Sequence, residues 1–274
     1  MTEITVGVNG VLGRMGRTVL AAVEGAPDMV PVGGADIKAA PQTAMPLPGG
    51  SGTIPLFAGP AALIEGVRPQ VLVDFTSGEG AEAALRAGAM AGVRVVSGST
   101  GISPAALVQA ERLAQEHEVG IIVAANFALG AVVLGHLAAI AARYFDYAEV
   151  VESHHEAKID APSGTALSLA RSLVEGRGAP FTSVVPEKET LPGTRGGVYE
   201  GVNVHSGRMP GRLAHHEVIF GAPGQTLSLV HDSISRDCFM PGVLLAVRRV
   251  MTVNGLIVGL DRVLGLELPA KAKP

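Results

Sequence analysis

Short runs of apolar, mostly β-branched residues alternate with longer amphipathic segments along the first half of the chain. The apolar runs predict strands at residues 4–8, 30–35, 71–75, 93–97 and 120–124, and the longer segments predict helices at 14–25, 79–91 and 103–117. Strands that are apolar along their whole length are typical of a parallel sheet with helices on both faces. We therefore expect residues 1–126 to form an α/β domain.

The pattern changes after Asn126. A long apolar helix is predicted at 129–145, followed by a strand at 148–153 and a helix at 164–175. Further strands near 198–205, 213–220 and 226–232, joined by glycine-containing turns, indicate an antiparallel or mixed sheet. Residues 127–238 are therefore expected to form an α+β domain built on a mixed sheet. The C-terminal segment 239–274 is expected to be helical, with its clearest helix at 241–253, and to join the first domain. The Pro- and Gly-rich stretch 41–52 is expected to be a loop.

Composition narrows the functional classes. The chain has 274 residues, of which 47% are hydrophobic, and a net charge of −4, which argues against a disordered chain and against a nucleic-acid partner. The one cysteine, Cys238, is interpreted as a small buried residue in a protein of a reducing compartment. The apolar stretch 120–142 is interrupted by Asn126 and contains His136, so it is interpreted as a buried strand and helix, with no membrane partner. The first strand begins too early for a signal peptide, and a cytoplasmic location is expected.

Glycines are concentrated in the segment GVNGVLGRMG, residues 7–16, between the first predicted strand and the first helix. Gly10 and Gly13 occupy the last two glycine positions of the G-x-G-x-x-G fingerprint, whereas Val8 stands at the first. Residues without a Cβ allow a pyrophosphate to approach the backbone, and free N–H groups at a helix start bind its charge, with Arg14 and Arg17 nearby. This context predicts a Rossmann-like dinucleotide site; a tight strand–helix turn without a ligand is the alternative.

Asp36 ends the second predicted strand. A carboxylate at this position accepts hydrogen bonds from the ribose hydroxyls of an adenosine and repels a 2′-phosphate. Ile37 follows it, so no adjacent arginine is there to hold that phosphate, and NADH is favoured over NADPH, although Lys38 is near enough to compensate in part. An ordinary carboxylate at a strand end is the alternative.

Two later strand ends carry small polar runs, SGSTG at residues 97–101 and AANF at residues 124–127. In a parallel sheet both lie at the carboxyl edge, where ligands bind. Their backbone groups are candidates for binding the nicotinamide amide; helix capping is the alternative interpretation.

The densest polar chemistry lies in the segment ESHHEAKIDAPSGTA, residues 152–166. Histidine readily gives up a proton near neutral pH, which makes proton donation the natural interpretation of this segment. If the preceding strand extends through His154 and His155, the two rings point to opposite faces, and both are expected to line a wide pocket. Ser163, Gly164 and Thr165 begin a helix whose N–H groups and hydroxyls would bind a carboxylate.

Other charged groups in this region have competing interpretations. Lys158 would add a charge-assisted contact to the same anion; a Schiff base is the alternative. Asp160 is expected to brace the loop through backbone hydrogen bonds. The adjacent histidines could instead hold a metal ion, but no cysteine or third close ligand accompanies them, so no metal is expected. A second pair, His215 and His216, lies in a predicted strand and is interpreted as structural.

Together these motifs resemble the 4-hydroxy-tetrahydrodipicolinate reductase family, also called dihydrodipicolinate reductase. The resemblance rests on the GxxGxxGRMG turn, the DFT at residues 74–76, the GSTG run, AANF and, above all, the ExHHxxKxDAPSGTA segment, and it extends along essentially the whole chain. It implies a Rossmann domain joined to an α+β domain and assembly as a homotetramer. It also implies NAD(P)H-dependent reduction of 4-hydroxy-tetrahydrodipicolinate, a small dicarboxylate, to tetrahydrodipicolinate with loss of water, in diaminopimelate and lysine biosynthesis.

The resemblance implies roles for individual residues as well. His154 is the implied proton donor, Lys158 helps to bind or protonate the substrate, and the other residues implied to bind the substrate are His155, Ser163, Gly164 and Thr165. The residues implied to bind the cofactor are Gly10, Val11, Leu12, Gly13, Arg14, Met15, Asp36, Gly98, Ser99, Thr100, Ala124, Ala125, Asn126 and Phe127. Two positions depart from the family pattern: Ile37 stands where arginine is common, which weakens the case for NADPH, and Ser99 replaces a threonine but keeps its hydroxyl.

The expected reaction is hydride transfer from reduced nicotinamide to a cyclic, imine-like dicarboxylate, completed by a proton from His154. A hinge between the domains would bring hydride and acceptor together. Two other interpretations stay open: a reductase of the same architecture that acts on a semialdehyde or ketone, and a regulatory module that binds NAD without turnover. The clustered histidines and lysine argue against the second, and substrate screening would separate the first.

Overall fold

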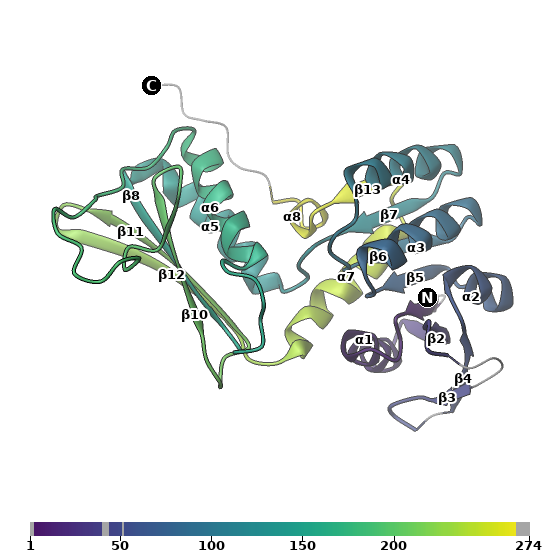
Figure 1. Cartoon of the computed structure of the whole chain (residues 1–274). Helices are drawn as coiled ribbons and strands as arrows, with labels where there is room; N and C mark the ends of the chain where they lie inside the picture. Colours follow the sequence, from purple (N-terminus) through teal and green to yellow (C-terminus); the bar gives the residue numbers. More distant parts are fainter. Residues whose placement is uncertain (1–2, 40–43, 51, 267–274) are drawn as a thin grey trace. The chain divides into compact units, whose positions relative to one another are not determined.

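The computed structural model describes residues 3–39, 44–50 and 52–266. The chain divides into two compact units (Figure 1). The first runs as far as Phe127 and takes in the later segment Phe239–Leu264, and the second begins at Ala128 and continues to Cys238.

Within the described residues, the first unit is built on an eight-stranded sheet in the order β13-β7-β6-β5-β1-β2-β4-β3. Neighbouring strands run parallel except for β3, which pairs antiparallel with β4 at one edge. The strand order reverses between β1 and β5, and such a switch point is where open α/β sheets bind ligands. The predicted α/β fold with a mostly parallel sheet is confirmed. The strands are β1 Ile4–Asn9, β2 Met29–Ala35, β3 Ala44–Pro46, β4 Thr53–Phe57, β5 Val71–Asp74, β6 Arg94–Ser97, β7 Gly120–Val123 and β13 Gly255–Val258.

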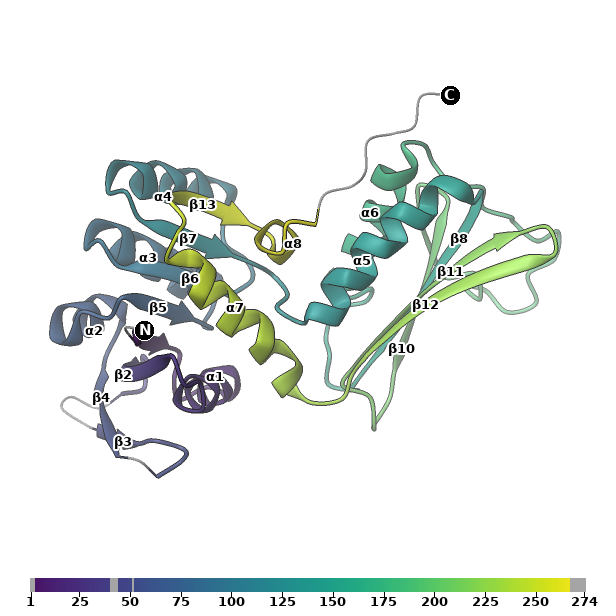
Figure 2. The same cartoon turned by 180° about the vertical axis from the view of Figure 1, so that it is seen from behind.

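Helices cover both faces of this sheet (Figure 2). On one face α1 packs against α7, and on the other α2, α3 and α4 follow one another across the strands. The short helix α8 packs beside α7 and β13. The helices are α1 Arg14–Glu24, α2 Pro60–Val67, α3 Gly78–Met90, α4 Pro104–Glu116, α7 Met240–Val250 and α8 Leu260–Val263.

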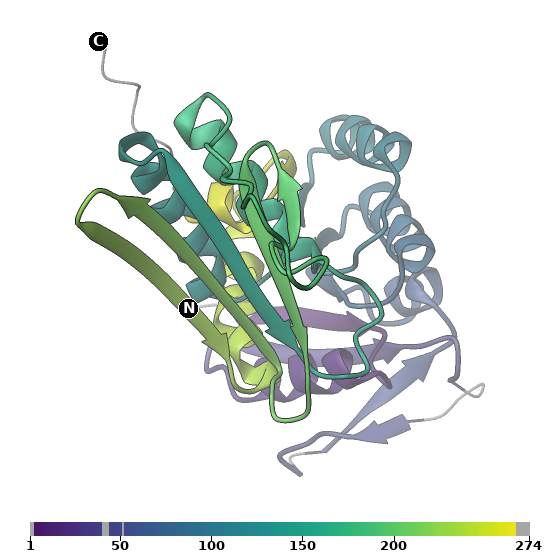
Figure 3. The ribbon, with the colours of Figure 1, turned by 60° about the vertical axis from the view of Figure 1, so that its left-hand side comes forward.

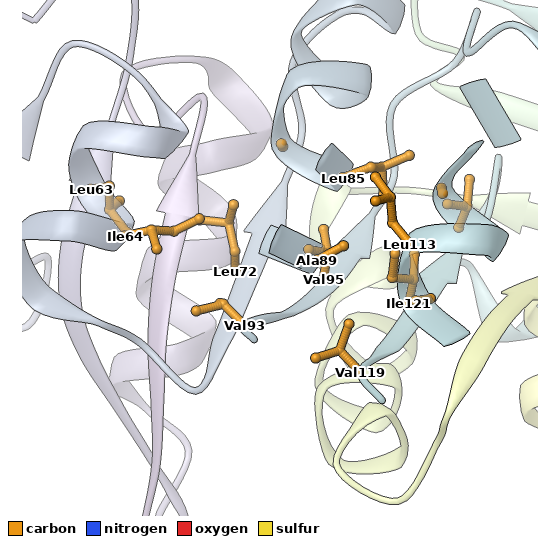
Figure 4. Close-up of a cluster of buried hydrophobic side chains, with 14 of the residues drawn as sticks. Leu63, Ile64, Leu72, Leu85, Ala89, Val93, Val95, Leu113, Val119 and Ile121 are labelled. Carbon is orange, nitrogen blue, oxygen red and sulfur yellow. The ribbon is translucent and has the colours of Figure 1, made fainter. Parts of the chain in front are cut away.

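The apolar positions of these helices form a continuous core with the strands beneath them (Figure 4). Leu63 of α2, Leu85 of α3 and Leu113 of α4 meet Leu72 and Ile121 of the sheet in one buried cluster. Two of the strands that contribute to it, β5 and β7, are buried along their whole length. This core holds the strand ends, and therefore the loops that follow them, in fixed positions.

The start of α4 shows how local sequence sets an element boundary. Ser103 is the N-cap residue, and its Oγ accepts a hydrogen bond from the backbone N–H of Ala106 at 3.2 Å. Pro104 occupies the first turn, where its missing N–H costs nothing. A serine followed by a proline is a typical sequence at the start of a helix.

In the described part of the second unit, five strands form a mixed sheet in the order β12-β11-β8-β10-β9. The central strand β8 pairs parallel with β10 and antiparallel with β11. Helices α5 and α6 pack on each other against one face of this sheet (Figure 3). The predicted α+β arrangement on a mixed sheet is confirmed. The elements are α5 Leu129–Ala141, β8 Tyr147–His154, α6 Gly164–Arg177, β9 Gly197–Tyr199, β10 Val202–Arg208, β11 Ala214–Ala222 and β12 Gln225–Ser233.

The chain between β2 and β5 holds more regular structure than its sequence indicates. Strand β3 lies inside the stretch 41–52 that was expected to be a loop, of which residues 41–43 and 51 lie outside the described residues. Strand β4 and helix α2 were not predicted. Strand β4 has Pro55 at its centre, which weakens its strand signal, and α2 is only eight residues long, too short for a clear helical period.

Two further expectations need correction. The strand expected over 198–205 is two strands, β9 and β10, because Glu200 (φ 43°) and Gly201 (φ 85°) make a turn between them. The C-terminal segment is not a single helix over 239–274: α7 ends at Val250, strand β13 then joins the edge of the first sheet beside β7, and α8 follows. The glycine at position 255, with φ 98°, allows the chain to turn into β13. Residues 267–274 of this segment lie outside the described residues.

Candidate active site

The helix-covered face of β8 changes from apolar to polar toward the end of the strand. Val150 is buried in the core under α6, and Glu152 and His154 continue on the same face because side chains alternate along a strand. The register places His216 of β11 opposite Glu152, and Arg208 of β10 opposite His154. Three strands thus bring four polar side chains to one surface, the β8 polar cluster, which consists of Glu152, His154, Arg208 and His216.

Glu152 has no exposed surface, and its carboxylate accepts hydrogen bonds at both oxygens. Oε2 lies 2.5 Å from Nδ1 of His154 and accepts from Nη1 of Arg208 at 3.0 Å. Oε1 accepts from Nη2 of Arg208 at 2.9 Å and from the backbone N–H of Ser163 at 3.2 Å. The arginine contact is therefore bidentate, and one buried carboxylate connects the end of β8 to the start of α6.

Ser163 caps α6, because its Oγ accepts a hydrogen bond from the backbone N–H of Ala166 at 3.1 Å. The same Oγ lies 3.2 Å from Nε2 of His216. The ring of His216 stands edge-on to the ring of His154, with centroids 5.3 Å apart. Burial lowers the pKa of His216 to about 4, so its imidazole is neutral at physiological pH and Nε2 can accept the serine proton. His216, interpreted from the sequence as structural, thus supports the cap of the helix expected to bind a carboxylate.

The pKa values of Glu152 and His154 are set by opposing effects. Burial alone would raise the pKa of Glu152, but hydrogen bonds from Arg208, Ser206, His154 and the Ser163 N–H together hold it below its ordinary value. Glu152 is therefore an anion at neutral pH. Burial lowers the pKa of His154, while the hydrogen bond and the charge of Glu152 act to raise it again. The carboxylate is thus what keeps this buried imidazole able to take up a proton.

The loop after β8 carries the remaining predicted substrate residues. Lys158 Nζ lies 2.7 Å from Oδ1 of Asp160, and Nη2 of Arg208 donates to the carbonyl oxygen of Asp160 at 2.5 Å. Asp160 therefore holds the loop through its carboxylate as well as its backbone. His155 lies just beyond β8 and is half-buried, and its carbonyl oxygen accepts from the Lys158 N–H at 3.1 Å. In the first turn of α6, Gly164 is exposed and Thr165 is half-buried.

In the first unit, the glycine-rich turn leads directly into α1. Gly13 is the N-cap residue and supplies no side-chain cap bond to the first turn of the helix. Gly10 has φ 80°, where a side chain causes strain, and a Cβ there would lie 2.6 Å from the carbonyl oxygen of Phe75. A Cβ on Gly16 would lie 2.0 Å from the carbonyl oxygen of Gly10. The turn is as close-packed as a pyrophosphate-binding turn must be, and the helix start keeps N–H groups for an anion.

Asp36 follows β2 and faces the same turn. Its Oδ2 accepts from the backbone N–H of Leu12 at 3.1 Å, and its Oδ1 accepts from the N–H of Lys38 at 3.0 Å. The neighbouring Ile37 is 91% exposed. The carboxylate is thus held beside the glycine-rich turn.

Asp74, at the end of β5, is fully buried and gathers four side-chain donors. Its carboxylate accepts hydrogen bonds from Asn9 Nδ2 at 2.8 Å, Thr76 Oγ1 at 2.7 Å, Ser97 Oγ at 2.8 Å and Ser99 Oγ at 2.7 Å. Ser99 Oγ in turn accepts from the Thr76 N–H at 2.7 Å. This Asp74 network joins the ends of β1, β5 and β6 and fixes the loop that begins at Gly98.

The other predicted cofactor residues lie at the same carboxyl edge of the sheet, because β1, β2, β5, β6 and β7 are parallel neighbours. Along these loops Gly98 and Asn126 are half-buried, and Thr100 and Ala125 are exposed. Ala124 and Phe127 are buried, and the Phe127 ring lies 5.8 Å from the ring of Phe75. The structure thus brings the predicted cofactor residues to one edge and the predicted substrate residues to the end of β8.

The cavity found in the second unit does not define the site. A cavity of about 390 Å³ in the second unit is lined by Tyr147, Glu149 and Arg195 among others, at the start of β8 and so at the opposite end of the strand from His154. Among the residues that the structure describes, no cluster of three or more His, Cys, Asp or Glu side chains is arranged to hold a metal ion. None of the helices in that part of the chain has the length and apolar character needed to cross a membrane.

Comparison with known proteins identifies the family. Two family models match: dihydrodipicolinate reductase, N-terminus, over residues 4–127, and dihydrodipicolinate reductase, C-terminus, over residues 130–264. The chain belongs to the dihydrodipicolinate reductase family. The 4-hydroxy-tetrahydrodipicolinate reductase of Dehalococcoides mccartyi is 47% identical over 266 residues, which cover 97% of this chain and 100% of that protein. The corresponding protein of Geobacillus kaustophilus is 41% identical over 262 residues, covering 95% and 99%.

A solved structure of a family member supports the same assignment. Dipicolinate-bound dihydrodipicolinate reductase from Paenisporosarcina sp. TG-14 matches with a TM-score of 0.85 and 36% identity, covering 95% of this chain and 99% of that chain. Membership of the reductase family confirms the predicted activity, NAD(P)H-dependent reduction of 4-hydroxy-tetrahydrodipicolinate in diaminopimelate and lysine biosynthesis. Family membership excludes the two alternative interpretations, a reductase of semialdehydes or ketones and a regulatory module that binds NAD without turnover.

Sequence reasoning about this reductase missed three members of the β8 polar cluster as site residues. Glu152 could have been found, because it precedes His154 by two positions on a predicted strand and so shares its face. Arg208 and His216 had no such sequence signal. Arg208 lies more than 50 residues from Glu152 in the chain, and His216 more than 50 from Ser163, so only strand pairing brings them together.

Proposed function

We propose that the protein binds its reduced nicotinamide cofactor at the carboxyl edge of the first sheet, binds 4-hydroxy-tetrahydrodipicolinate at the end of β8, and uses His154 to donate the proton that completes the reduction. One observation carries this proposal. His154 is paired with a buried carboxylate that also accepts from the Ser163 N–H at the start of α6, and it lies within the electrostatic influence of Lys158. A proton donor and an anion-binding helix start are thus built into one place.

The residues at the carboxyl edge fit a dinucleotide. Gly10 to Met15 would hold the pyrophosphate, Asp36 the adenosine ribose, and the loops Gly98–Thr100 and Ala124–Phe127 the nicotinamide end. The cradle formed by Gly10 and Gly16 supports this placement, because a Cβ at either position would collide with backbone. The cofactor supplies the hydride, and the protein supplies its position.

We infer a preference for NADH over NADPH. Asp36 presents a carboxylate where the ribose hydroxyls would bind, and a 2′-phosphate would meet its negative charge. The next residue, Ile37, is exposed and offers no positive charge to that phosphate. Lys38 is the nearest cation in sequence, which leaves NADPH as the weaker cofactor.

The substrate carries two carboxylates, and the site offers two kinds of anion contact. Ser163 caps only the Ala166 N–H, so the N–H groups of Gly164 and Thr165 and the Thr165 hydroxyl are available for one carboxylate. Lys158 and His155 lie on the adjoining loop for the second. The ligand of the Paenisporosarcina relative, dipicolinate, supports a dicarboxylate in this class of site.

The proton step follows from the hydrogen bond of His154. A carboxylate accepts only, so the nitrogen that faces Glu152, Nδ1, must carry its own proton. Nε2 is then the nitrogen that gives up a proton to the substrate. A bound dianion would raise the pKa of His154, because its negative charge favours the imidazolium. Substrate binding would therefore favour the charged form of the donor.

The second unit also supports assembly as a homotetramer in the cytoplasm. Both of its described helices lie on one face of the sheet, and the other face exposes Tyr147, Val198 and Val230 at 44%, 60% and 54%. Apolar side chains on an uncovered sheet face favour pairing with another copy of the chain. The single cysteine fits a reducing compartment.

Steady-state oxidation of NADH and of NADPH, each with freshly generated 4-hydroxy-tetrahydrodipicolinate, tests the proposal. Rapid oxidation with the cyclic dicarboxylate, a higher kcat/KM with NADH, and slow oxidation with open-chain semialdehydes and ketones are expected. Faster turnover of an open-chain substrate would remove the substrate assignment, and a higher kcat/KM with NADPH would overturn the role given to Asp36 and Ile37.

A further inference from the structure

Glu152 is the only group in the described structure that contacts the proton donor, the start of α6 and a neighbouring strand through one side chain. Its two oxygens accept from the His154 ring, the Ser163 N–H and the two Nη groups of Arg208, and the Ser206 side chain adds a further hydrogen bond. All of its acceptor directions are thus occupied by protein groups, and none is left for a substrate. Whatever Glu152 contributes to the reaction, it contributes through its neighbours.

We propose that Glu152 is the positioning residue of the proton transfer: held by Arg208, it fixes the Nδ1–H tautomer of His154, aims Nε2 at the substrate and keeps the buried ring able to carry a second proton. This rests on the role of His154 as proton donor. Arg208 acts on Glu152 rather than on the substrate, because its guanidinium is engaged with both carboxylate oxygens and with the carbonyls of Gly207 and Asp160.

The electrostatic surroundings of His154 show why a carboxylate is needed. The positive groups that act on the ring are Arg208 on β10 and Lys158 on the following loop, and the neutral ring of His216 stands edge-on to it from β11. Each cation opposes protonation of the ring, and so does burial. Among the residues that the structure describes, Glu152 is the one anion in direct contact with His154. Without it, the pKa of the ring would fall further, and a smaller fraction of the protein would hold the imidazolium that acts as the acid.

The tautomer argument is independent of the pKa argument. A neutral histidine can carry its proton on either nitrogen, and only the Nδ1–H form leaves Nε2 free to take up the proton that is later transferred. The 2.5 Å contact between Nδ1 and a fully buried carboxylate selects this form. The ring cannot flip without breaking that contact, so its orientation is fixed as well.

The first arm of the test needs no activity. Protein labelled with ¹⁵N at the histidine rings is titrated by NMR, with the His154 signals assigned from the His154→Gln variant. In the unmodified protein the neutral ring should be the Nδ1–H tautomer. In Glu152→Gln the pKa of His154 should fall by about one unit, which corresponds to a tenfold change in its protonation equilibrium. An Nε2–H tautomer in the unmodified protein, or the same His154 titration in both proteins, overturns the proposal.

The second arm measures turnover as a function of pH. An acid must be protonated to act, so activity falls as pH rises through the pKa of His154. This fall is the basic limb of the pH–rate profile, and it should move to lower pH in Glu152→Gln. At pH values above both limbs, kcat should fall by roughly tenfold, with KM changed less than about threefold. Glu152→Asp, which keeps the charge, should recover most of the limb position. A limb that stays in place in Glu152→Gln contradicts the proposal.

A double variant separates positioning from general structural support. If Glu152 acts through His154, adding Glu152→Gln to His154→Gln should change kcat by less than about twofold, because the group it positions is already gone. Equal losses in both backgrounds would show a structural role and overturn the proposal. Glu149→Gln is the matched control, since Glu149 lies on the same strand and pairs with Arg195, away from His154. It should leave the basic limb where it is.

The failure of the two proposals can be told apart. Near-normal turnover in His154→Gln would remove His154 as the proton donor, whereas the NMR titration would still report whether Glu152 sets the tautomer and pKa of the ring. A normal pH profile in Glu152→Gln together with a large loss of turnover in His154→Gln would support His154 as the proton donor and overturn only the positioning role of Glu152.

Discussion

Replacing Gly16 with alanine tests whether the turn before α1 depends on close backbone packing. The added Cβ would lie 2.0 Å from the carbonyl oxygen of Gly10, 2.6 Å from its carbonyl carbon and 2.7 Å from the Cα of Val11. The closest of these is about 1.5 Å inside the optimal separation of non-bonded atoms. All three are backbone atoms, so no side chain can rotate away, and the helix start must move from the turn.

The expected cost of Gly16→Ala is at the upper end of the range for overpacking, about 3 kcal/mol. For a domain of this size that corresponds to a fall in Tm of roughly 6–12 °C. The displaced turn should also bind the cofactor pyrophosphate less well, and the Kd for NADH should rise about tenfold or more, since it loses hydrogen bonds to a charged group. Thermal unfolding and titration with NADH measure the two effects.

Gly25→Ala is the matched control on the same helix. Gly25 has φ −78°, and its Cβ would meet only the carbonyl oxygens of Ala21 at 3.4 Å and Ala22 at 3.9 Å, which are ordinary contacts. Alanine there should be neutral or stabilise by about 0.4–1 kcal/mol, because it restricts the unfolded chain. If Gly16→Ala kept the Tm and the NADH affinity of the unmodified protein, the close packing at this turn would have no energetic significance.

Three further predictions address the two sites. Asp74→Asn should cost about 2 kcal/mol in urea denaturation, because hydrogen bonds to a buried anion are replaced, and should weaken NADH binding; unchanged values for both would contradict the role given to the Asp74 network. The pKa of His216 is about 4 in the folded protein and near 6.5 when unfolded, so the unfolded state binds more protons between these values. Stability should therefore fall by about 3 kcal/mol as pH drops from 6.5 to 4, and His216→Gln should remove that part of the dependence; an unchanged slope in the variant would refute it. His154→Gln and Lys158→Ala should each lower kcat by about 10² or more, and near-normal turnover would exclude a catalytic role.

Much of the first sheet could be predicted, because its buried strands are also apolar in sequence. Val71–Asp74 and Gly120–Val123 are buried at every position, and apart from the hydrogen-bonded Asp74 that ends the first of them, each is an apolar run in the chain. The same logic fails for short or mixed elements. Thr53–Phe57 contains a proline, and β13 follows α7 with only four residues between them. Neither segment therefore has a sequence pattern that predicts a strand. The conformation of these segments depends on tertiary packing, which the local hydrophobic pattern does not reveal.

Part of the candidate active site could be predicted from the sequence, and part could not. His154, Lys158 and Ser163 lie within one short segment, so their spacing could be interpreted from sequence. Arg208 and His216 reach the segment only because β8 lies between β10 and β11 in the sheet, with a register that depends on the whole second unit. The burial of Glu152, which turns an ordinary glutamate into the partner of the proton donor, is likewise a property of the folded sheet.

A crystal structure with NADH and dipicolinate bound is the most direct test of the central claim. The account predicts one dipicolinate carboxylate on the N–H groups of Gly164 and Thr165, with Nε2 of His154 facing the ligand ring and Nδ1 still on Glu152. A ligand bound away from the start of α6, or a His154 ring turned so that Nε2 faces away from it, would contradict the account.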